Sequence, residues 1–426
     1  MKVTFYVNAM VLLESKKSRV LCDPWVTFDT QSISGFYGFP KPTFTREEVA
    51  AIKPDFIYIT HTHPDHFDPP TLRLFDRSTP ILVAPYVQNF TERMARSLGF
   101  TDVRVVPLET GAPLNGDDRI WIEPAAVYPE VDSIALFRLD GEMAVNANDN
   151  VFSESQCVHL RELAGRIDVA LLPSGAHGPF PMFFENLTDD EKRGAATKRA
   201  AAQKNAFVKY IHALQPKYVV PIAGGIICGG AKVRQYVYSG IRPRSEVIDA
   251  ALKQVQFKPA MVSERCAFDS ATGKVTGTYV EKSFESEEGY LDELAAQPSL
   301  FGAEGRFHIA PDQRVDLSRL LANARKNQKR WQERHNITSQ SRYYFDVGDE
   351  RLYGLSLADE EVRRVRQEDL PENEEYEIYR LPYELLVGLL TRHYIWSNAN
   401  TQHMWFYRNM PKVDPGLLLL MNYLQV

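Results

Sequence analysis

A cluster of histidines and aspartates in the first quarter of the chain has the residue types and the spacing of a metal site. It reads HTHPDH and directly follows the β-branched and aromatic run FIYIT. Imidazole and carboxylate groups are ligands for zinc and iron. In an extended loop His61 and His63 project to the same side, so both can bind one ion. Asp65 and His66 point differently and can reach a second ion nearby, so the cluster predicts one or two metal ions.

The alternative is a surface loop that is rich in histidine by chance. It is disfavoured because the whole chain of 426 residues contains only ten histidines. Predicted elements also hold the loop at both ends. The strand Phe56–Thr60 precedes it, and a helix begins after Asp68, where a capping acid stands before Pro69 and Pro70.

The rest of the first half alternates short strands with helices, which predicts an α/β fold. The clearest helix begins at the capping box formed by Thr188 and Glu191 and continues to Leu214. Arg19–Cys22 leads into the turn Asp23-Pro24. The predicted strands share β-branched and aromatic residues and are bounded by turn residues: Val3–Val7, Val11–Glu14, Arg19–Cys22, Ile81–Pro85, Arg104–Pro107, Arg119–Glu123, Ile134–Arg138, Ala144–Asn146, Asp168–Pro173 and Tyr218–Ile222.

The pattern weakens after about residue 250. The basic segment Arg325–Arg334 predicts an exposed helix. A strand-like stretch near Tyr343, an acidic loop, and apolar helices around Leu385–Leu390 and Leu417–Leu424 predict a smaller C-terminal α+β region. We therefore expect three parts: a catalytic domain at 1–250, an extension with connecting helices at 251–342, and the C-terminal region at 343–426.

Composition and charge exclude several classes of protein. Lys and Arg total 49 and Asp and Glu total 55, so the net charge is −6 and there is no electrostatic case for nucleic-acid binding. Apolar residues make up 44 %, which excludes a wholly disordered chain. The four cysteines lie far apart, which disfavours a disulfide framework. With no signal-peptide pattern and no apolar run of membrane-spanning length, we expect a cytoplasmic protein without a membrane partner.

The H-x-H-x-D-H pattern resembles the signature of the metallo-β-lactamase fold superfamily. The resemblance implies an αββα sandwich with the metal site at one edge of its two sheets. It also implies an aspartate that bridges two metal ions. The stretch LDGEMAVNANDN looks like the strand and loop that carry this residue, which makes Asp149 the candidate. An aspartate in an Asn-rich turn can instead cap its own loop.

Longer stretches are similar to the catalytic region of the cytidine-monophosphate N-acetylneuraminate hydroxylase family. They occur in the shared order ILVAP, VYPEVDSIALF, DVALLPSGAHGPFPM and LQPKYVVPIAGG, and LCDPW and LLTRHYIWSNANTQHMWFYRNMP also look similar. The resemblance covers most of the chain. It implies hydroxylation of a nucleotide-linked sialic acid with molecular oxygen and iron, with electrons arriving through a Rieske iron–sulfur domain.

The sequence departs from that family at two points. No Rieske pattern of two Cys and two His occurs in it. Tyr128 stands where the family has a histidine. Three roles are open for it: a metal ligand, a hydrogen-bond donor to a metal ligand, or a packed side chain without a role in the site. Glu130 and Asp132 lie beside it, and either could complete a more carboxylate-rich site. Ala223 occupies a position where many superfamily members place another histidine, so it offers no ligand.

His177 is a further candidate because it lies in a Gly- and Pro-rich loop after a predicted strand, where such folds place residues that contact substrate. It is a late ligand, an acid–base group or a plain loop histidine. The candidate metal ligands are therefore His61, His63, Asp65, His66, Asp149, Tyr128 and Glu130, and the candidate catalytic residues are Asp65, Tyr128 and His177.

Two enzymatic functions follow from these residues. In the first, two metal ions, with iron favoured, activate oxygen to oxidise a small organic substrate. This oxygenase would need a separate electron-transfer protein or electrons from the substrate. In the second, zinc or manganese activates water to hydrolyse an ester, amide or phosphodiester, with Asp65 orienting the attacking group. A binding module without catalysis is the third hypothesis.

Overall fold

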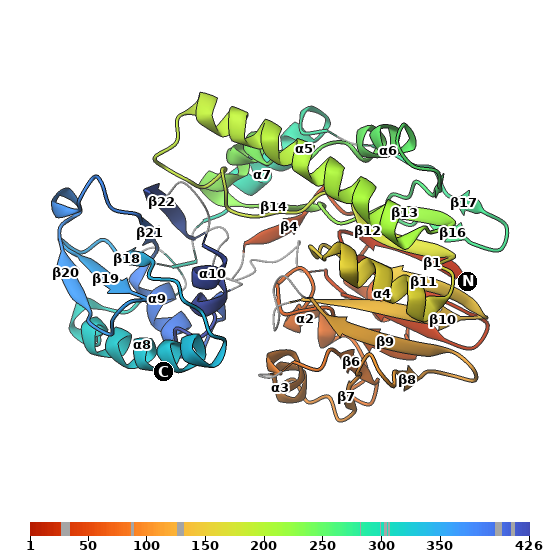
Figure 1. Cartoon of the computed structure of the whole chain (residues 1–426), viewed down its shortest axis with the longest axis horizontal. Coiled ribbons are helices and arrows are strands. Elements are labelled where there is room, and N and C mark those ends of the chain that lie inside the picture. Colours follow the sequence, from red (N-terminus) through yellow and green to blue (C-terminus); the bar gives the residue numbers. More distant parts are fainter. Residues whose placement is uncertain are drawn as a thin grey trace.

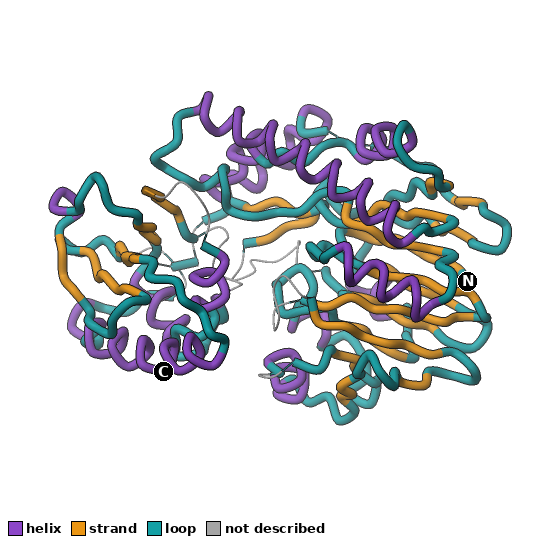
Figure 2. The backbone as a smooth tube through the Cα atoms, viewed as in Figure 1, coloured by secondary structure: helices purple, strands orange, loops and turns teal. Residues whose placement is uncertain are grey.

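The computed structural model describes residues 1–26, 35–86, 89–125, 132–281, 283–298, 300–301, 305, 307–396, 403–409 and 414–426. Within these ranges the chain forms an αββα sandwich and a smaller C-terminal α+β region, as the sequence predicts (Figures 1 and 2). The two regions are built from separate sheets.

The first sheet of the sandwich has the strand order β17-β16-β1-β2-β3-β5-β6-β7. In it β3, β5, β6 and β7 are parallel to one another, and β1 and β2 run antiparallel as a hairpin. The strands are β1 (Lys2–Val7), β2 (Met10–Glu14), β3 (Arg19–Cys22), β5 (Phe56–Tyr58), β6 (Ile81–Val83), β7 (Val103–Val105), β16 (Ala267–Asp269) and β17 (Lys274–Thr276).

The second sheet has the order β15-β13-β12-β11-β10-β9-β8, and β11, β12, β13 and β15 are parallel. Its strands are β8 (Ala112–Pro113), β9 (Arg119–Pro124), β10 (Ser133–Leu139), β11 (Glu142–Asn146), β12 (Val169–Pro173), β13 (Tyr218–Ile222) and β15 (Lys258–Pro259). A separate two-stranded ribbon joins β4 (Phe36–Gly38) to β14 (Ile226–Cys228).

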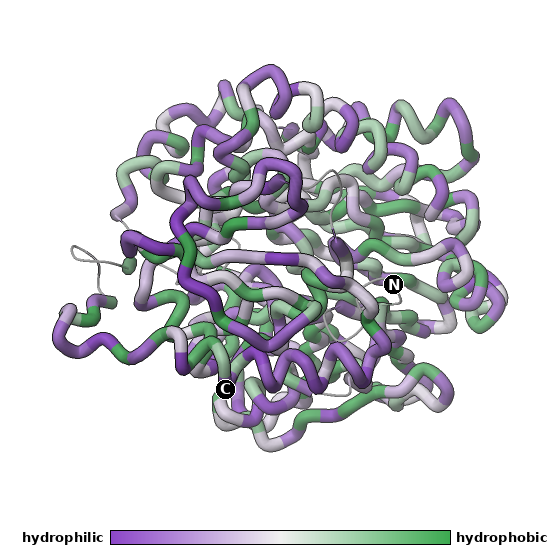
Figure 3. Tube along the Cα trace, turned by 60° about the vertical axis from the view of Figure 1, so that its left-hand side comes forward, coloured by the Kyte–Doolittle hydropathy of each residue, from purple (hydrophilic) through white to green (hydrophobic). Residues whose placement is uncertain are grey.

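Apolar side chains divide the sandwich into layers. Val3, Val20, Phe137 and Val220 belong to the core between the two sheets. On the outer face of the first sheet lie α1 (Arg46–Ala50), α2 (Pro69–Leu72) and α3 (Phe90–Ser97), and on that of the second lie α4 (Glu154–Ala164), α5 (Asp189–Leu214) and α6 (Arg244–Leu252). Hydrophobic residues are frequent along the strands and hydrophilic ones along the outer turns (Figure 3). Both faces of each sheet are therefore covered, as parallel strands require.

The C-terminal region contains a five-stranded sheet of order β20-β19-β18-β21-β22. One core cluster joins this sheet to helices α7 to α10 and to the sandwich residues Phe183, Ile227 and Tyr236. The elements are α7 (Glu288–Ala295), α8 (Leu317–Arg334), β18 (Arg342–Asp346), β19 (Leu352–Ser356), β20 (Arg363–Val365), β21 (Tyr376–Arg380), α9 (Tyr383–Leu390), β22 (Trp405–Asn409) and α10 (Pro415–Met421).

The prediction of an exposed helix at Arg325–Arg334 is wrong at Arg325. The segment is the second half of α8, but Arg325 is only 1 % exposed. Its guanidinium donates to the carbonyl oxygens of Ser356, Leu357 and Asp359 at about 3.0 Å. These carbonyls lie where β19 ends, and their alignment with α8 depends on tertiary packing.

Candidate metal centre

The carboxyl ends of strands from both sheets meet at one edge of the sandwich. Polar residues follow these ends in the loops: Asn8 after β1, Asp23 after β3, His61 to His66 after β5, Asp149 after β11 and His177 after β12. The strands concerned run in the same direction within each sheet. Loops at the carboxyl ends of strands therefore gather the polar groups in one place, as is usual for α/β folds.

The histidine loop is short and internally bonded. The backbone N–H groups of His66 and Phe67 both donate to the carbonyl oxygen of His63, at 3.0 and 2.7 Å. Phe67 packs in the core on the outer face of the first sheet. The expected helix follows as α2, and the Asp68 carboxylate accepts from the backbone N–H of Thr71 at 3.0 Å. These contacts set the orientation of the ligand side chains.

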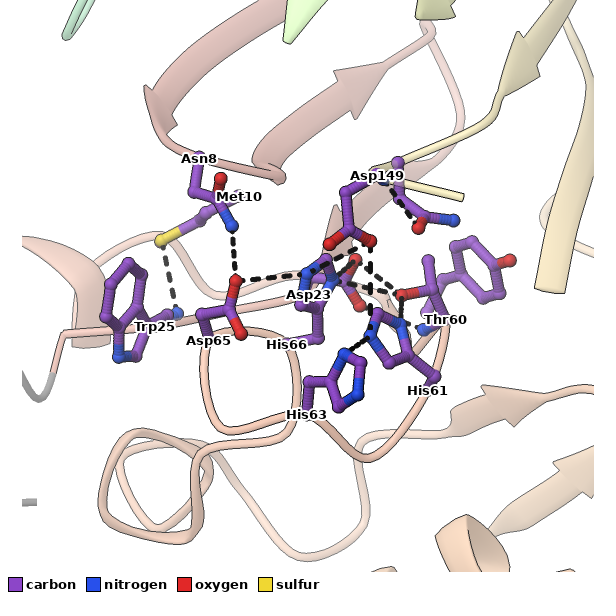
Figure 4. Close-up of polar contacts among 12 residues, drawn as sticks. Asn8, Met10, Asp23, Trp25, Thr60, His61, His63, Asp65, His66 and Asp149 are labelled. Carbon is purple, nitrogen blue, oxygen red and sulfur yellow. Dashed lines mark hydrogen bonds and ion pairs between the residues drawn. The ribbon is translucent and has the colours of Figure 1, made fainter. Parts of the chain in front are cut away.

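Five predicted ligands converge in this loop and the loop after β11 (Figure 4). Nε2 of His66 lies 3.2 Å from Oδ2 of Asp65 and 3.4 Å from Oδ1 of Asp149. Nε2 of His61 lies 2.6 Å from Nδ1 of His63 and 4.0 Å from Oδ1 of Asp149. Two triads of donor atoms result, each with all its atoms within 4.8 Å of one another: His61, His63 and Asp149; and Asp65, His66 and Asp149.

Asp149 belongs to both triads, so it lies where a carboxylate bridging two ions would lie. Oδ1 of Asp149 and Nε2 of His66 are both buried and, among the described residues, have no hydrogen-bond partner. Buried polar atoms without a partner are costly, and the cost disappears when they bind a cation. The two triads therefore fit a dinuclear metal site whose metal identity the donor set does not specify.

Asp23 is one of two residues of this cluster that the sequence analysis does not predict. Its Oδ2 accepts from Nδ1 of His66 at 2.8 Å and from the Thr60 hydroxyl at 2.9 Å. Its Oδ1 accepts from the backbone N–H of Thr60, also at 2.9 Å. A carboxylate bonded to one ring nitrogen of a histidine fixes the orientation of the ring and the nitrogen that carries the proton. Here Asp23 thereby directs Nε2 of His66 towards the other donors. The available signal was an acid in the turn that follows a buried strand.

The Thr60 hydroxyl has a similar effect on His61. Because it donates to Asp23, it accepts from Nδ1 of His61 at 2.9 Å. Oδ1 of Asp132 lies 3.3 Å from the same nitrogen. The proton of His61 is therefore held on Nδ1, which leaves Nε2 as a lone-pair donor for a metal.

Asn8 positions Asp65 from the hairpin of the first sheet. Its side-chain Nδ2 donates to Oδ2 of Asp65 at 2.6 Å, and its Oδ1 accepts from the backbone N–H of Gly225 at 3.1 Å. Asn8 has a φ of +50° in the turn between β1 and β2, where an asparagine is readily accepted. This residue was not predicted either.

Burial and charge set the protonation of the cluster. Burial lowers the pKa of His61 and of His63 to about 4, so both are neutral near pH 7. For His66 burial opposes protonation, but the carboxylates of Asp149, Asp65 and Asp23 outweigh it and raise the pKa well above 6.5. Although burial disfavours the charge on Asp149, His66 and His61 lower its pKa. The pKa of Asp65 is lowered as well, so both of these carboxylates are ionised, whereas His66 must release its second proton to bind a metal.

The remaining candidates have different placements. Tyr128 and Glu130 lie outside the described residues, so their roles stay predictions. His177 donates from Nε2 to the carbonyl oxygen of Gly224 at 3.1 Å, and its ring lies 5.4 Å from that of Tyr236. It belongs to neither donor triad of the described residues. Ala223 is buried after β13 and offers no ligand atom.

The strand orders, the helix-covered faces and the metal edge together identify the architecture of the sandwich. It is the metallo-β-lactamase fold. No family model matches the chain. The cytidine monophosphate-N-acetylneuraminic acid hydroxylase of Mus musculus is 28 % identical over 237 residues, which are 52 % of this chain and 39 % of that protein. The Danio rerio protein of the same name is 26 % identical over 233 residues, 52 % of this chain and 38 % of that protein.

The homology is therefore distant, and the matched segment spans about two fifths of these curated relatives. Among solved structures, the chain is similar to an isothiocyanate hydrolase from Delia radicum gut bacteria. The TM-score is 0.46 and the identity 15 %, over 63 % of this chain and 99 % of that one. A variant of the β-hydroxylase CmlA has a TM-score of 0.41 and 19 % identity over 63 % of this chain and 53 % of that one. No helix of the described residues is long and apolar enough to span a bilayer.

Proposed function

We propose that this protein is an iron-dependent oxygenase that hydroxylates a small organic substrate. One observation carries the proposal: His61, His63 and Asp149 form a triad of two imidazoles and one carboxylate. That ligand set is typical of non-haem iron oxygenases. The hydroxylases to which half of the chain is distantly similar support the same reaction class.

The chain's own residues have separate tasks in this proposal. His61, His63 and Asp149 would hold one ion, and Asp65, His66 and Asp149 would hold the other. Iron would supply the one-electron redox chemistry that oxygen activation needs. Asp23 and Thr60 accept hydrogen bonds from Nδ1 of His66 and of His61, so that Nε2 of each ring would be the atom that binds an ion. Asn8 holds the Asp65 carboxylate by a hydrogen bond of 2.6 Å.

The overall reaction must balance atoms and electrons. A C–H bond is converted into a C–OH bond, one oxygen atom of O2 enters the product, and the other leaves as water with two electrons and two protons. We propose that the two electrons come from a separate electron-transfer protein.

His177 lies on the same edge of the sandwich and is the acid–base candidate. The Gly224 carbonyl accepts from its Nε2–H, so Nδ1 is left as a proton acceptor.

The second candidate is a hydrolase. Imidazole and carboxylate ligands also occur at zinc and manganese sites. In this alternative the ions would make water a better nucleophile for an ester, amide or phosphodiester, and Asp65 would orient it.

Metal identity and oxygen dependence separate the two functions. The protein is purified without added metal, its metal content is measured by inductively coupled plasma mass spectrometry, and the iron is examined by Mössbauer spectroscopy. Turnover of a substrate panel that includes CMP-N-acetylneuraminate is then followed with a chemical reductant under ¹⁸O₂. The oxygenase predicts iron and one ¹⁸O atom per product. Zinc as the bound metal, with turnover that persists without oxygen or reductant, would overturn it in favour of the hydrolase.

A further inference from the structure

A cavity of about 580 Å³ lies behind the metal edge. The ends of β1, β12 and β13, the beginning of α6 and the segments 278–281 and 283–285 contribute to its walls. Asn8 and His177 line it, and Asn8 also holds the metal-site residue Asp65. A space of this size fits a small organic molecule.

Arg244 lines this cavity, and its guanidinium makes no ion pair with a carboxylate among the described residues. Its Nη1 donates to the carbonyl oxygen of Val262 at 3.0 Å, and its Nη2 makes a long contact of 3.5 Å with that of Ala223. The guanidinium lies over the ring of Phe5, 4.6 Å from its centre. Among the described residues no carboxylate oxygen lies within 4.0 Å of its guanidinium nitrogens. Burial lowers the pKa of Arg244, and the nearby Tyr279 and Glu281 offset this only in part.

The other basic residues of the cavity are paired. Nε of Arg242 lies 3.0 Å from Oε2 of Glu246, and Nζ of Lys41 lies 2.6 Å from Oε2 of Glu293. Arg265 pairs with Glu48 at 2.7 Å. Arg244 therefore differs from every other basic side chain that lines the cavity.

Two acids of the cavity wall are already bonded elsewhere. The Glu281 carboxylate accepts from the backbone N–H groups of Arg244 and Ser245, at 2.6 and 3.1 Å, where α6 begins. Glu264 accepts from the backbone N–H and the hydroxyl of Thr43, at 2.9 and 2.5 Å. Glu285 lines the cavity as well and is exposed. Among the described residues the Arg244 guanidinium thus has unused donors and no carboxylate bonded to it.

We propose that this cavity binds an organic anion, a carboxylate or a phosphate monoester with an apolar body, whose charged group pairs with Arg244. A guanidinium presents planar, paired donors that match either anion. The apolar body would contact Phe5, Phe39 and Ile241, which line the cavity. The proposal does not depend on the reaction at the metal centre, because it needs neither the ions nor turnover.

Isothermal titration calorimetry on the full-length protein tests the proposal with benzoate, phenyl phosphate and the neutral analogue benzamide. We expect at least one anion to bind, and benzamide to bind at least tenfold more weakly. Arg244→Gln should weaken the binding of that anion at least tenfold, whereas Arg242→Gln should leave it unchanged, because Arg242 lines the same cavity but is paired with Glu246. Comparison of the affinities for benzoate and phenyl phosphate shows whether the cavity prefers a carboxylate or a phosphate monoester.

A second measurement uses the wild-type protein, in case Arg244→Gln fails to fold. Arginines are modified with phenylglyoxal and located by mass spectrometry. We expect the anion to slow the modification of Arg244 and not that of Arg242. Equal binding of benzamide, unchanged binding to Arg244→Gln, or the absence of both binding and protection with the two anions would overturn the proposal.

Discussion

Nδ1 of His66 lies 2.8 Å from Oδ2 of Asp23, and both side chains are fully buried. The contact joins the loop after β3 to the loop after β5 and directs Nε2 of His66 towards Asp65 and Asp149. An acceptor behind a metal-binding histidine also keeps the ring in the tautomer that binds.

Substitution of Asp23 should weaken one metal position more than the other. In Asp23→Asn the amide loses the charge that orients His66, so we expect the affinity of the ion held by Asp65 and His66 to fall by about 10–100-fold. The ion held by His61 and His63 should be retained. Competition titrations with a chromophoric chelator measure both. Asp168→Asn is the control, because Asp168 is a buried aspartate just before β12, whereas the metal edge lies at that strand's carboxyl end. Equal weakening of both positions by Asp23→Asn would contradict the assignment.

Asp149 should couple the two metal positions because it belongs to both triads. We expect Asp149→Ala to lose both ions, His63→Ala to lose mainly one, and Asp65→Ala to lose mainly the other. Inductively coupled plasma mass spectrometry on the folded variants measures the number of metal ions bound per chain. If Asp149→Ala retained as much metal as His63→Ala, the bridging role would be refuted.

His177 should affect turnover and not metal content. Its Nε2–H is bonded to the Gly224 carbonyl, and it lies outside both donor triads of the described residues. We therefore expect His177→Gln to keep the metal content of the wild type and, if Nδ1 exchanges a proton with substrate, to lower kcat by about 10²–10⁴-fold. A clear fall in bound metal would instead make His177 a ligand.

The stability contributed by Lys232 should depend on pH. Its side chain is fully buried, donates to the carbonyl oxygen of Met404, and lies 4.2 Å from the ring centre of Phe183. Burial lowers its pKa from 10.5 to about 7 in the folded protein. Between pH 7 and 10.5 the unfolded chain keeps the proton and the folded chain does not, so the free energy of unfolding rises with pH by up to about 1.4 kcal/mol per pH unit.

Urea unfolding of the wild type and of Lys232→Met between pH 6.5 and 9.5 measures this effect. The stability of the wild type relative to the variant should increase with pH. Lys204→Met is the matched control, since Lys204 is on the surface of α5 and pairs with Glu246. A difference between the wild type and Lys232→Met that does not change with pH would show that the lysine stays charged when buried.

The sequence by itself predicted those parts of the site that are local in the chain. His61, His63, Asp65 and His66 lie within six residues, so their spacing alone shows that they can share metal ions. The apolar runs of the neighbouring strands are local signals as well. So is the capping box at which the helix of residues 189–214 begins. Asp149 is distant in the sequence, and only the resemblance to a superfamily singled it out.

Only the tertiary structure decided which distant residues support the ligands. Asp23 and Asn8 are an acid and an amide in two turns, and nothing in their neighbours predicts a metal site. They reach His66 and Asp65 because β1, β3 and β5 belong to one sheet, with β1 linked to β3 through β2. The missing counter-charge of Arg244 and the burial of Arg325 depend on packing in the same way. Hydrogen bonds and charge pairs form between atoms about 3 Å apart in space. This distance in space does not depend on how far apart two residues lie in the sequence. Strand pairing and packing must therefore bring such partners together.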